Sequence, residues 1–198
     1  KLTGAVVLGG IAGPILLLFG LRNAAASSVS LWLNLELVAT AVLGAIFFKD
    51  HLGKTGWAGV LTALVSSIVL TMHEGPSGIL PAALTGLACL CWGFDNHFTA
   101  LIDGISAVQS TFIKGLFAGT VNTIIGHFLP GPAPAGELIL YSLLLGGLSY
   151  GMSIVLYIMS AQKLGATRSQ VIFSSAPFFG VIFSVIFLAE SISSAQGV

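Results

Sequence analysis

The segment Leu31–Asp50 reads LWLNLELVATAVLGAIFFKD, an apolar run that ends in a charged cluster at residues 49–51. Its apolar part extends from Leu31 to Phe48. At a rise of about 1.5 Å per residue, a helix of this length nearly crosses a hydrocarbon core about 30 Å thick, and the two preceding residues extend it. The segment therefore predicts a transmembrane helix.

One carboxylate, Glu36, lies inside this apolar run, two residues after Asn34. An ionisable group at such a depth costs at least about 2.5 kcal/mol, so by default it marks a site or a pathway. The structural alternative is a Glu that snorkels to the near surface or hydrogen-bonds between helices. On a helix, Asn34 and Glu36 point about 200° apart, so at most one of them faces a cavity squarely.

The composition extends the membrane prediction to the whole chain. Of its 198 residues, 56% are hydrophobic and 7% are charged, whereas a soluble domain carries about 25% charged residues. The net charge is zero and no basic block occurs, so nothing favours nucleic acid as a partner. Cys89 and Cys91 would point away from each other on a helix, which disfavours a disulfide or a metal site.

Apolar segments of near-spanning length follow one another along the chain, joined by short connections that carry the charges and turn-forming residues. Short connections make successive helices antiparallel neighbours. We therefore expect an all-α membrane protein, a polytopic bundle of about seven transmembrane helices. The expected helices are Leu2–Leu21, Val29–Phe48, Gly56–Met72, Ile79–Leu101, Val108–Leu129, Leu138–Met159 and Val171–Leu188.

The cationic residues predict the orientation of this bundle. Six of the seven fall toward one side, and Arg22 alone lies on the other. Cationic loops stay in the cytoplasm, so residue 1 is expected inside and residue 198 outside.

No cleavable signal peptide is visible, and the chain starts without Met and stops as a new apolar segment could begin, so we expect a fragment of a longer protein.

A shift of 140 residues superimposes Ala26–Asp50 on Ala166–Glu190. Both copies begin with small residues, continue as an apolar span and end in an acid, as IFFKD in the first and IFLAE in the second. The equivalent helices are five spans apart, an odd number, so the second copy is inverted in the membrane. Secondary transporters are built from such repeats, with the substrate site near the midplane between them.

Several motifs carry a family resemblance across nearly the whole chain. They are Ala26–Ser28, Leu33–Glu36 and Phe47–Asp50 in the first copy, Gly165–Thr167, Ser175–Pro177 and Phe187–Glu190 in the second, and Trp92–Asn96 with Lys114–Gly119 between them. Together they resemble the EamA-type branch of the drug/metabolite transporter superfamily.

The resemblance implies inverted five-helix repeats in a ten-helix fold, of which this chain would hold helices three to nine. Residues 1–75 would be the C-terminal part of the first repeat, and residues 76–198 the second repeat without its last helix. It implies a multi-pass transporter of the cell membrane, such as the bacterial inner membrane, that moves a small polar or amphipathic metabolite or drug by alternating access. The partners would be this small-molecule substrate and the lipid bilayer, with a homodimer left open and with no cofactor.

Transport needs a polar patch in a cavity that opens alternately to each side. The candidates for substrate binding are polar residues inside the expected spans: Asn34, Glu36, Asn96, Tyr150, Ser153 and Ser174. For the Ser and Tyr residues, hydrogen bonding between helices is the structural alternative. Glu36 is also the candidate for coupling to a proton or a cationic substrate, because a carboxyl group removed from water binds a proton more readily.

Asp95 and Lys114 are expected to form a charge pair. Each lies about 10 Å from the cytoplasmic end of adjacent antiparallel helices. An unpaired charge at that depth would be costly, whereas a pair neutralises the site. The pair would lock the bundle or line an inner vestibule.

Two other classes of protein compete with a transporter. An enzyme is disfavoured because no catalytic motif is present and the four His residues show no metal-ligand spacing, so we expect neither catalytic residues nor a metal site. A membrane scaffold that transports nothing is the other class, and a bundle without a central cavity would favour it.

Overall fold

The structure is a computed structural model that describes residues 1–129, 131 and 134–190. Helices account for all regular secondary structure within these residues, which confirms the all-α prediction. The elements, in order, are α1 (Leu2–Gly4), η1 (Ala5–Ala12), α2 (Gly13–Leu21), α3 (Ala26–Trp32), α4 (Leu35–Leu43), η2 (Gly44–Phe48), α5 (Lys54–Glu74), α6 (Pro76–Ala100), α7 (Ala107–Phe128), α8 (Gly136–Leu144), η3 (Leu145–Gly151), α9 (Met152–Leu164), α10 (Ala166–Phe173) and α11 (Ala176–Leu188), where η marks π-helical turns.

Six of these helical columns are long and apolar enough to cross a membrane. They are Leu2–Leu21, Ala26–Phe48, Lys54–Glu74, Pro76–Ala100, Gly136–Leu164 and Ala166–Leu188. The remaining expected span, Val108–Leu129, forms α7, which has 22 residues and is therefore long enough. It falls outside the six because Gln109, Lys114, Asn122 and His127 dilute its apolar residues.

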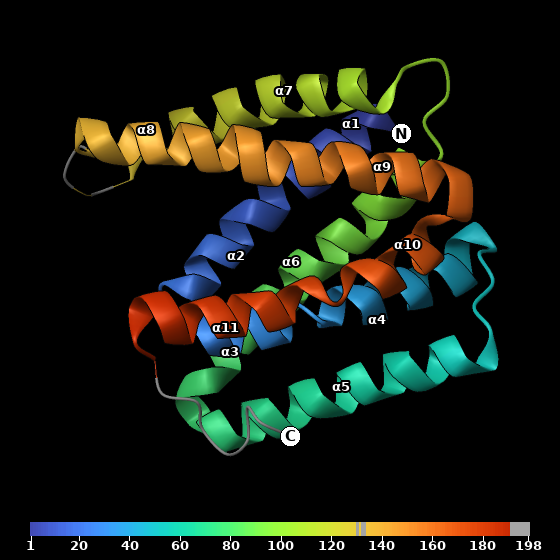
Figure 1. The fold of residues 1–198 in the computed structure, drawn as a ribbon, viewed down its shortest axis with the longest axis horizontal. Coiled ribbons are helices and arrows are strands. Elements are labelled where there is room, and N and C mark those ends of the chain that lie inside the picture. Colours follow the sequence, from blue (N-terminus) through green and yellow to red (C-terminus); the bar gives the residue numbers. More distant parts are fainter. Residues whose placement is uncertain (130, 132–133, 191–198) are drawn as a thin grey trace.

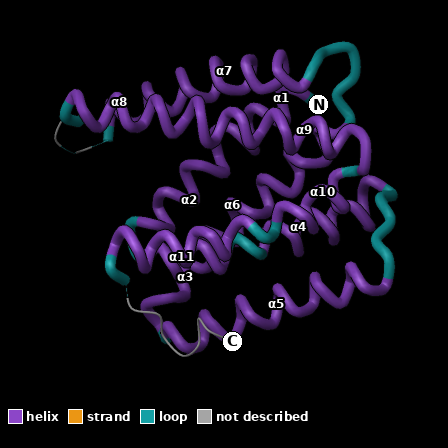
Figure 2. The backbone as a smooth tube through the Cα atoms, in the orientation of Figure 1, coloured by secondary structure: helices purple, strands orange, loops and turns teal. Residues whose placement is uncertain are grey.

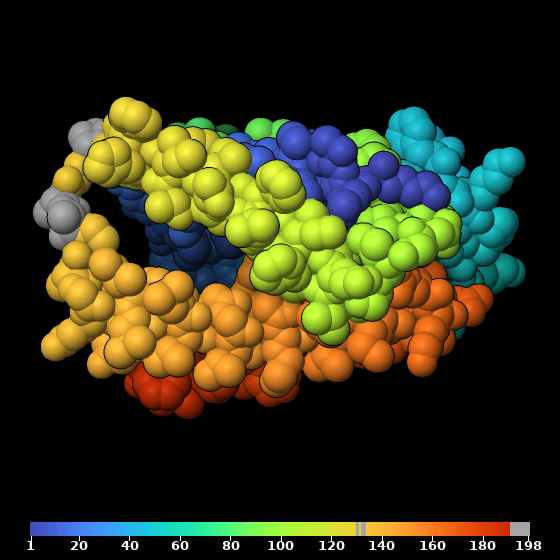
Figure 3. Space-filling view, turned by 90° about the horizontal axis from the view of Figure 1, so that it is seen from above, coloured from blue at the N-terminus to red at the C-terminus, as the bar shows by residue number. Residues whose placement is uncertain are grey.

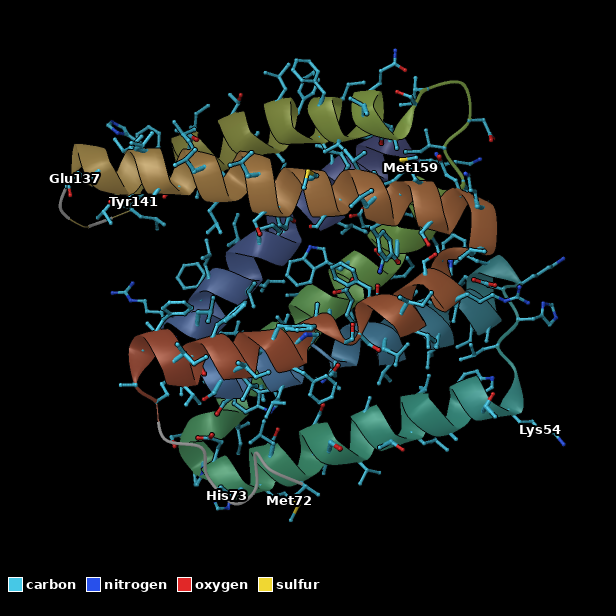
Figure 4. The ribbon with its side chains drawn as sticks, in the orientation of Figure 1. Lys54, Met72, His73, Glu137, Tyr141 and Met159 are labelled. Atoms are coloured by element: carbon cyan, nitrogen blue, oxygen red, sulfur yellow. The ribbon has the colours of Figure 1, made fainter. Side chains whose placement is uncertain are left out.

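The helices lie side by side in one bundle (Figure 1). η3 joins α8 and α9 into one long helix that runs beside α7, and α5 forms the opposite edge (Figures 1 and 2). Seen from above, α7 and the α8–α9 column diverge toward the end where α8 begins (Figure 3). Lys54 and His73 mark the two ends of the bundle along α5 (Figure 4).

The two sequence copies break and end in the same way. The first helix is interrupted by a turn between α3 and α4, and the second by a turn between α10 and α11. Lys49 and Ala189, 140 positions apart, are the non-glycine residues with positive φ among those described, at 54° and 53°. In both copies the residue that follows donates its backbone N–H to the carbonyl group six positions earlier. Asp50 donates to Gly44 at 3.0 Å, and Glu190 donates to Ser184 at 3.4 Å.

Each copy also caps the helix of the other. Asp50 Oδ2 accepts the backbone N–H of Thr167 at 3.0 Å, at the start of α10. Glu190 accepts the N–H groups of Ala26 and Ser27 at 3.0 and 2.9 Å, at the start of α3. α3 packs against α11 and α4 against α10. Because the end of each helix meets the beginning of the other, the two copies are antiparallel.

Hydrogen bonding from the Ser27 side chain, supported by the N–H groups of Ser27 and Ala26, lowers the pKa of Glu190 below its ordinary value. The folded protein therefore favours the charged form of Glu190. The stability that this cap contributes is complete above the pKa of an unfolded Glu and is lost as the pH falls through the lowered pKa.

Removing a cap should destabilise the bundle. We expect Asp50→Ala to cost about 1 kcal/mol, the usual cost of losing a side-chain cap at a helix N-terminus, whereas Asp50→Asn keeps an acceptor oxygen and should cost less. Thermal unfolding in detergent micelles, followed by circular dichroism, measures the difference. Asp103→Ala is the matched control, because Asp103 is 95% exposed and its 3.8 Å ion pair with Lys1 contributes little. Equal stability of Asp50→Ala and Asp103→Ala would contradict the role of the cap.

Candidate functional site

A cavity of about 230 Å³ lies beside the break in the first repeat helix. Glu36, on the first turn of α4, lines it together with residues of α6, α7, α9 and α10. Most of its wall is apolar, and its charged lining residues are Glu36, Asp95 and Lys114. We call it the Glu36 cavity.

Asn96 connects Glu36 to both repeats. The two N–H groups of its Nδ2 are shared among three acceptors: Glu36 Oε1 at 2.9 Å, Thr40 Oγ1 at 3.0 Å and Gln170 Oε1 at 3.3 Å. Thr40 belongs to α4 and Gln170 to α10, so one amide on α6 bridges the two antiparallel copies. Within the described residues, Glu36 Oε2 accepts no hydrogen bond, which leaves this oxygen for a ligand.

Asp95 and Lys114 form a closed ion pair in the same cavity. Lys114 Nζ lies 2.6 Å from Asp95 Oδ2 and 2.8 Å from Oδ1, and Thr99 Oγ1 donates to Oδ1 at 2.8 Å. Both Asp95 and Lys114 are only 7% exposed. The structure thus brings together the two charges that the sequence suggested as a pair, and their charges cancel at this end of the cavity.

Two glycines of the first span allow it to approach the site. A Cβ added at Gly9 would collide with the carboxyl group of Asp95, and one at Gly13 would lie 2.7 Å from Trp92 Nε1. Trp92 Nε1 donates to the carbonyl of Gly9 at 3.0 Å, which fixes the indole as part of the cavity wall. The Gly9-xxx-Gly13 spacing therefore serves the contact between this span and α6. The same spacing recurs at Gly147-xxx-Gly151 in the sixth expected span, where a Cβ added at Gly147 would meet nothing within 4 Å.

Aromatic rings form much of the remaining wall. Trp92, Tyr150, Tyr157 and Phe173 all line the Glu36 cavity. Tyr157 and Phe173 meet edge to face with ring centroids 5.4 Å apart, which joins α9 to α10.

A second cavity of about 240 Å³ lies between the two repeat helices and also contains Glu36. Its other polar lining residues are Ser30, Gln170 and Ser174, and Pro177 and Gly180 close it on the α11 side. Ser30 is four residues from the start of α3, so this cavity extends toward the end that Glu190 caps. Glu36 therefore lines both cavities, as do Leu33 in the helix break and Phe173 at the end of α10.

The structure gathers most of the predicted site residues. Glu36, Asn96, Tyr150, Ser153, Asp95 and Lys114 line the Glu36 cavity, and Ser174 lines the second cavity. Asn34 lines neither of these two cavities, whereas Leu33, the other residue of the turn between α3 and α4, lines both. Ser153 and Ser174 donate to backbone carbonyls three residues earlier, at 3.0 and 2.7 Å.

Sequence reasoning missed three residues of the site. Gln170 was placed in a connection, because the polar start of the last helix hid its true beginning at Ala166. Trp92 was not among the expected site residues, because a Trp in a membrane helix is typical of the interface or of packing. Thr40 was not singled out, although one helical turn after Glu36 it shares the same helix face.

Comparison with known proteins is consistent with this architecture. A model described as the EamA-like transporter family matches residues 80–198, more than half of the chain. A protein of Methanothermobacter thermautotrophicus, named an uncharacterized transporter, is 27% identical over 204 aligned positions. The alignment includes 97% of this chain and 58% of that relative, so the chain spans little more than half the length of the curated relative it matches.

Breaking the buried ion pair should impair folding. Asp95→Ala leaves Lys114 as an unpaired buried cation, and we expect a loss of about 3–5 kcal/mol. Exchanging the two charges, with Asp95→Lys and Lys114→Asp together, should restore much of this stability. The yield of monodisperse protein in detergent and its thermal unfolding report the effect. Lys1→Ala, which breaks an exposed pair, should change stability by no more than about 1 kcal/mol. A double variant no more stable than the singles would contradict the pairing.

The close approach at Gly9 predicts opposite effects of one substitution at two glycines. Gly9→Ala should destabilise by about 1–3 kcal/mol, because the methyl group forces the Asp95 carboxyl group out of place. Gly119→Ala should stabilise by up to about 1 kcal/mol, because nothing lies within 4 Å of its Cβ position and Ala favours a helix. Unfolding of both variants in the same detergent tests this, and a neutral Gly9→Ala would refute the close contact.

Proposed function

We propose that this chain, which belongs to the EamA-like transporter family, forms the solute-binding part of a secondary transporter that works by alternating access. The observation that carries the proposal is the position of Glu36, at the helix break of one repeat and shared between two cavities. Membrane transporters bind solutes near the midplane at discontinuous helices of inverted repeats. The chain is a multi-pass membrane protein, and we place its cation-rich end in the cytoplasm of a bacterial cell.

The two caps supply a pair of gates in this proposal. Asp50 holds α10 at one end of the antiparallel helix pair, and Glu190 holds α3 at the other. Each cap is a small set of hydrogen bonds at one end of the spanning helices, where the protein meets water. Either cap can therefore open while the other stays closed. In our proposal, opening one cap admits solute to the cavity on that side, and Glu36 meets the solute from both sides.

The alternative classes explain fewer of these observations. A scaffold needs no cavity at a carboxylate, yet residues of α4, α6, α7, α9 and α10 line the Glu36 cavity. The family match points to a transporter rather than an enzyme. We therefore propose that the lipid-embedded bundle binds and transports a small-molecule substrate.

Access to residue 36 from both faces of the membrane tests this proposal without knowledge of the substrate. In a chain whose Cys89 and Cys91 are replaced by Ala, a single Glu36→Cys should react with a membrane-impermeant cationic methanethiosulfonate added to either face of sealed vesicles. Labelling is read by mass spectrometry of vesicles of both orientations. Leu116→Cys is the control, since Leu116 is 54% exposed on the surface that meets lipid and should react from neither face. Reaction of Glu36→Cys from one face only, or from neither, would overturn alternating access at this site.

A further inference from the structure

We propose that the Glu36 cavity selects a small organic amine, a protonated ammonium group attached to an apolar body. This inference rests on the proposed function, since it names the class of solute for the same cavity. It follows from three features of the cavity: its charge balance, its wall and its size.

The charge balance leaves one carboxylate without a cation. Lys114 is committed to both oxygens of Asp95, and Thr99 donates to the same carboxyl group, so this pair is neutral and closed. Glu36 receives only the neutral amide of Asn96, on Oε1. In a medium of low dielectric, a bound cation at Oε2 would neutralise Glu36 and add a charge-assisted hydrogen bond. An anion would instead meet an uncompensated negative charge.

The wall suits an apolar body that carries such a cation. Trp92, Tyr150, Tyr157 and Phe173 supply rings to the same cavity wall as the carboxylate, and ring faces attract ammonium groups when water is excluded. Ser153 Oγ, which donates to the carbonyl of Tyr150 at 3.0 Å, keeps lone pairs that can accept a second N–H of a primary ammonium. The rest of the lining, such as Leu33 and Ile154, is aliphatic and favours a hydrocarbon portion.

The volume limits the size of the solute. At about 230 Å³ the cavity is smaller than the range of about 300–1,000 Å³ that holds drug-sized ligands. A single ring with a short aminoalkyl chain fits this limit, whereas a multi-ring cation or a nucleotide does not.

The test compares three compounds of nearly equal shape: phenethylamine, the neutral 2-phenylethanol and the anionic phenylacetate. Binding to the full chain in lipid nanodiscs is measured by isothermal titration calorimetry. We expect phenethylamine to bind at least about tenfold more tightly than either analogue, the difference that one charge-assisted hydrogen bond provides. Glu36→Gln should remove this preference, so that the amine binds no better than the alcohol.

Glu137→Gln is the matched control, because it removes an exposed carboxylate in the first turn of α8 (Figure 4) and should leave the preference unchanged. Equal affinity for all three compounds, tighter binding of phenylacetate, or a preference that survives Glu36→Gln would each overturn the proposal. Binding at equilibrium requires no transport. Amine selectivity without labelling of residue 36 from both faces would therefore refute the transport mechanism alone, and two-sided labelling without amine selectivity would refute the solute class alone.

Discussion

The exchange of helix caps between the two repeats is the interaction on which the rest of this structure depends. Backbone N–H groups at the first turn of a helix have no partner inside that helix, and in or near lipid they must find one. Here the acid that ends each copy supplies the acceptor for the other, from Asp50 to Thr167 and from Glu190 to Ala26 and Ser27. The exchange satisfies both helix starts and fixes the antiparallel register, so that the helix breaks lie near each other.

The register in turn determines where polar groups can lie. A turn inside a membrane helix frees carbonyl groups and leaves space for side chains that lipid would not accept. Glu36 follows such a turn, and Asn96 ties it to Thr40 on its own helix and to Gln170 on the opposite copy. The carboxylate is therefore held by both repeats at once. A movement of one repeat against the other would change this network directly, which is the physical reason to connect the site with the gates.

Patterns that repeat along the chain made much of this predictable from the sequence. The 140-residue shift located the acid-ended helices, and the cost of an unpaired charge in lipid predicted that Asp95 and Lys114 would meet. Hydropathy placed the starts of the two acid-ended helices at Val29 and Val171, three and five residues after their observed starts. The reason is that buried polar residues such as Ser28 and Gln170 resemble loop residues in hydropathy. A regular helix could not show which of Asn34 and Glu36 faces the cavity, because the turn before α4 changes their relative directions.

The two copies share their caps but differ at their centres. The 140-residue shift that pairs Asp50 with Glu190 places Ala176 opposite Glu36, so only the first copy has a carboxylate on the first turn after its break. The second copy contributes Pro177 and Gly180 instead, and a Cβ added at Gly180 would lie 2.5 Å from Ser30 Oγ. By the same shift, Pro177 and Gly180 correspond to Leu37 and Thr40, one and four positions after Glu36. A symmetric pair of carboxylates would repel each other in this small space, whereas a single one can be neutralised by a single cation.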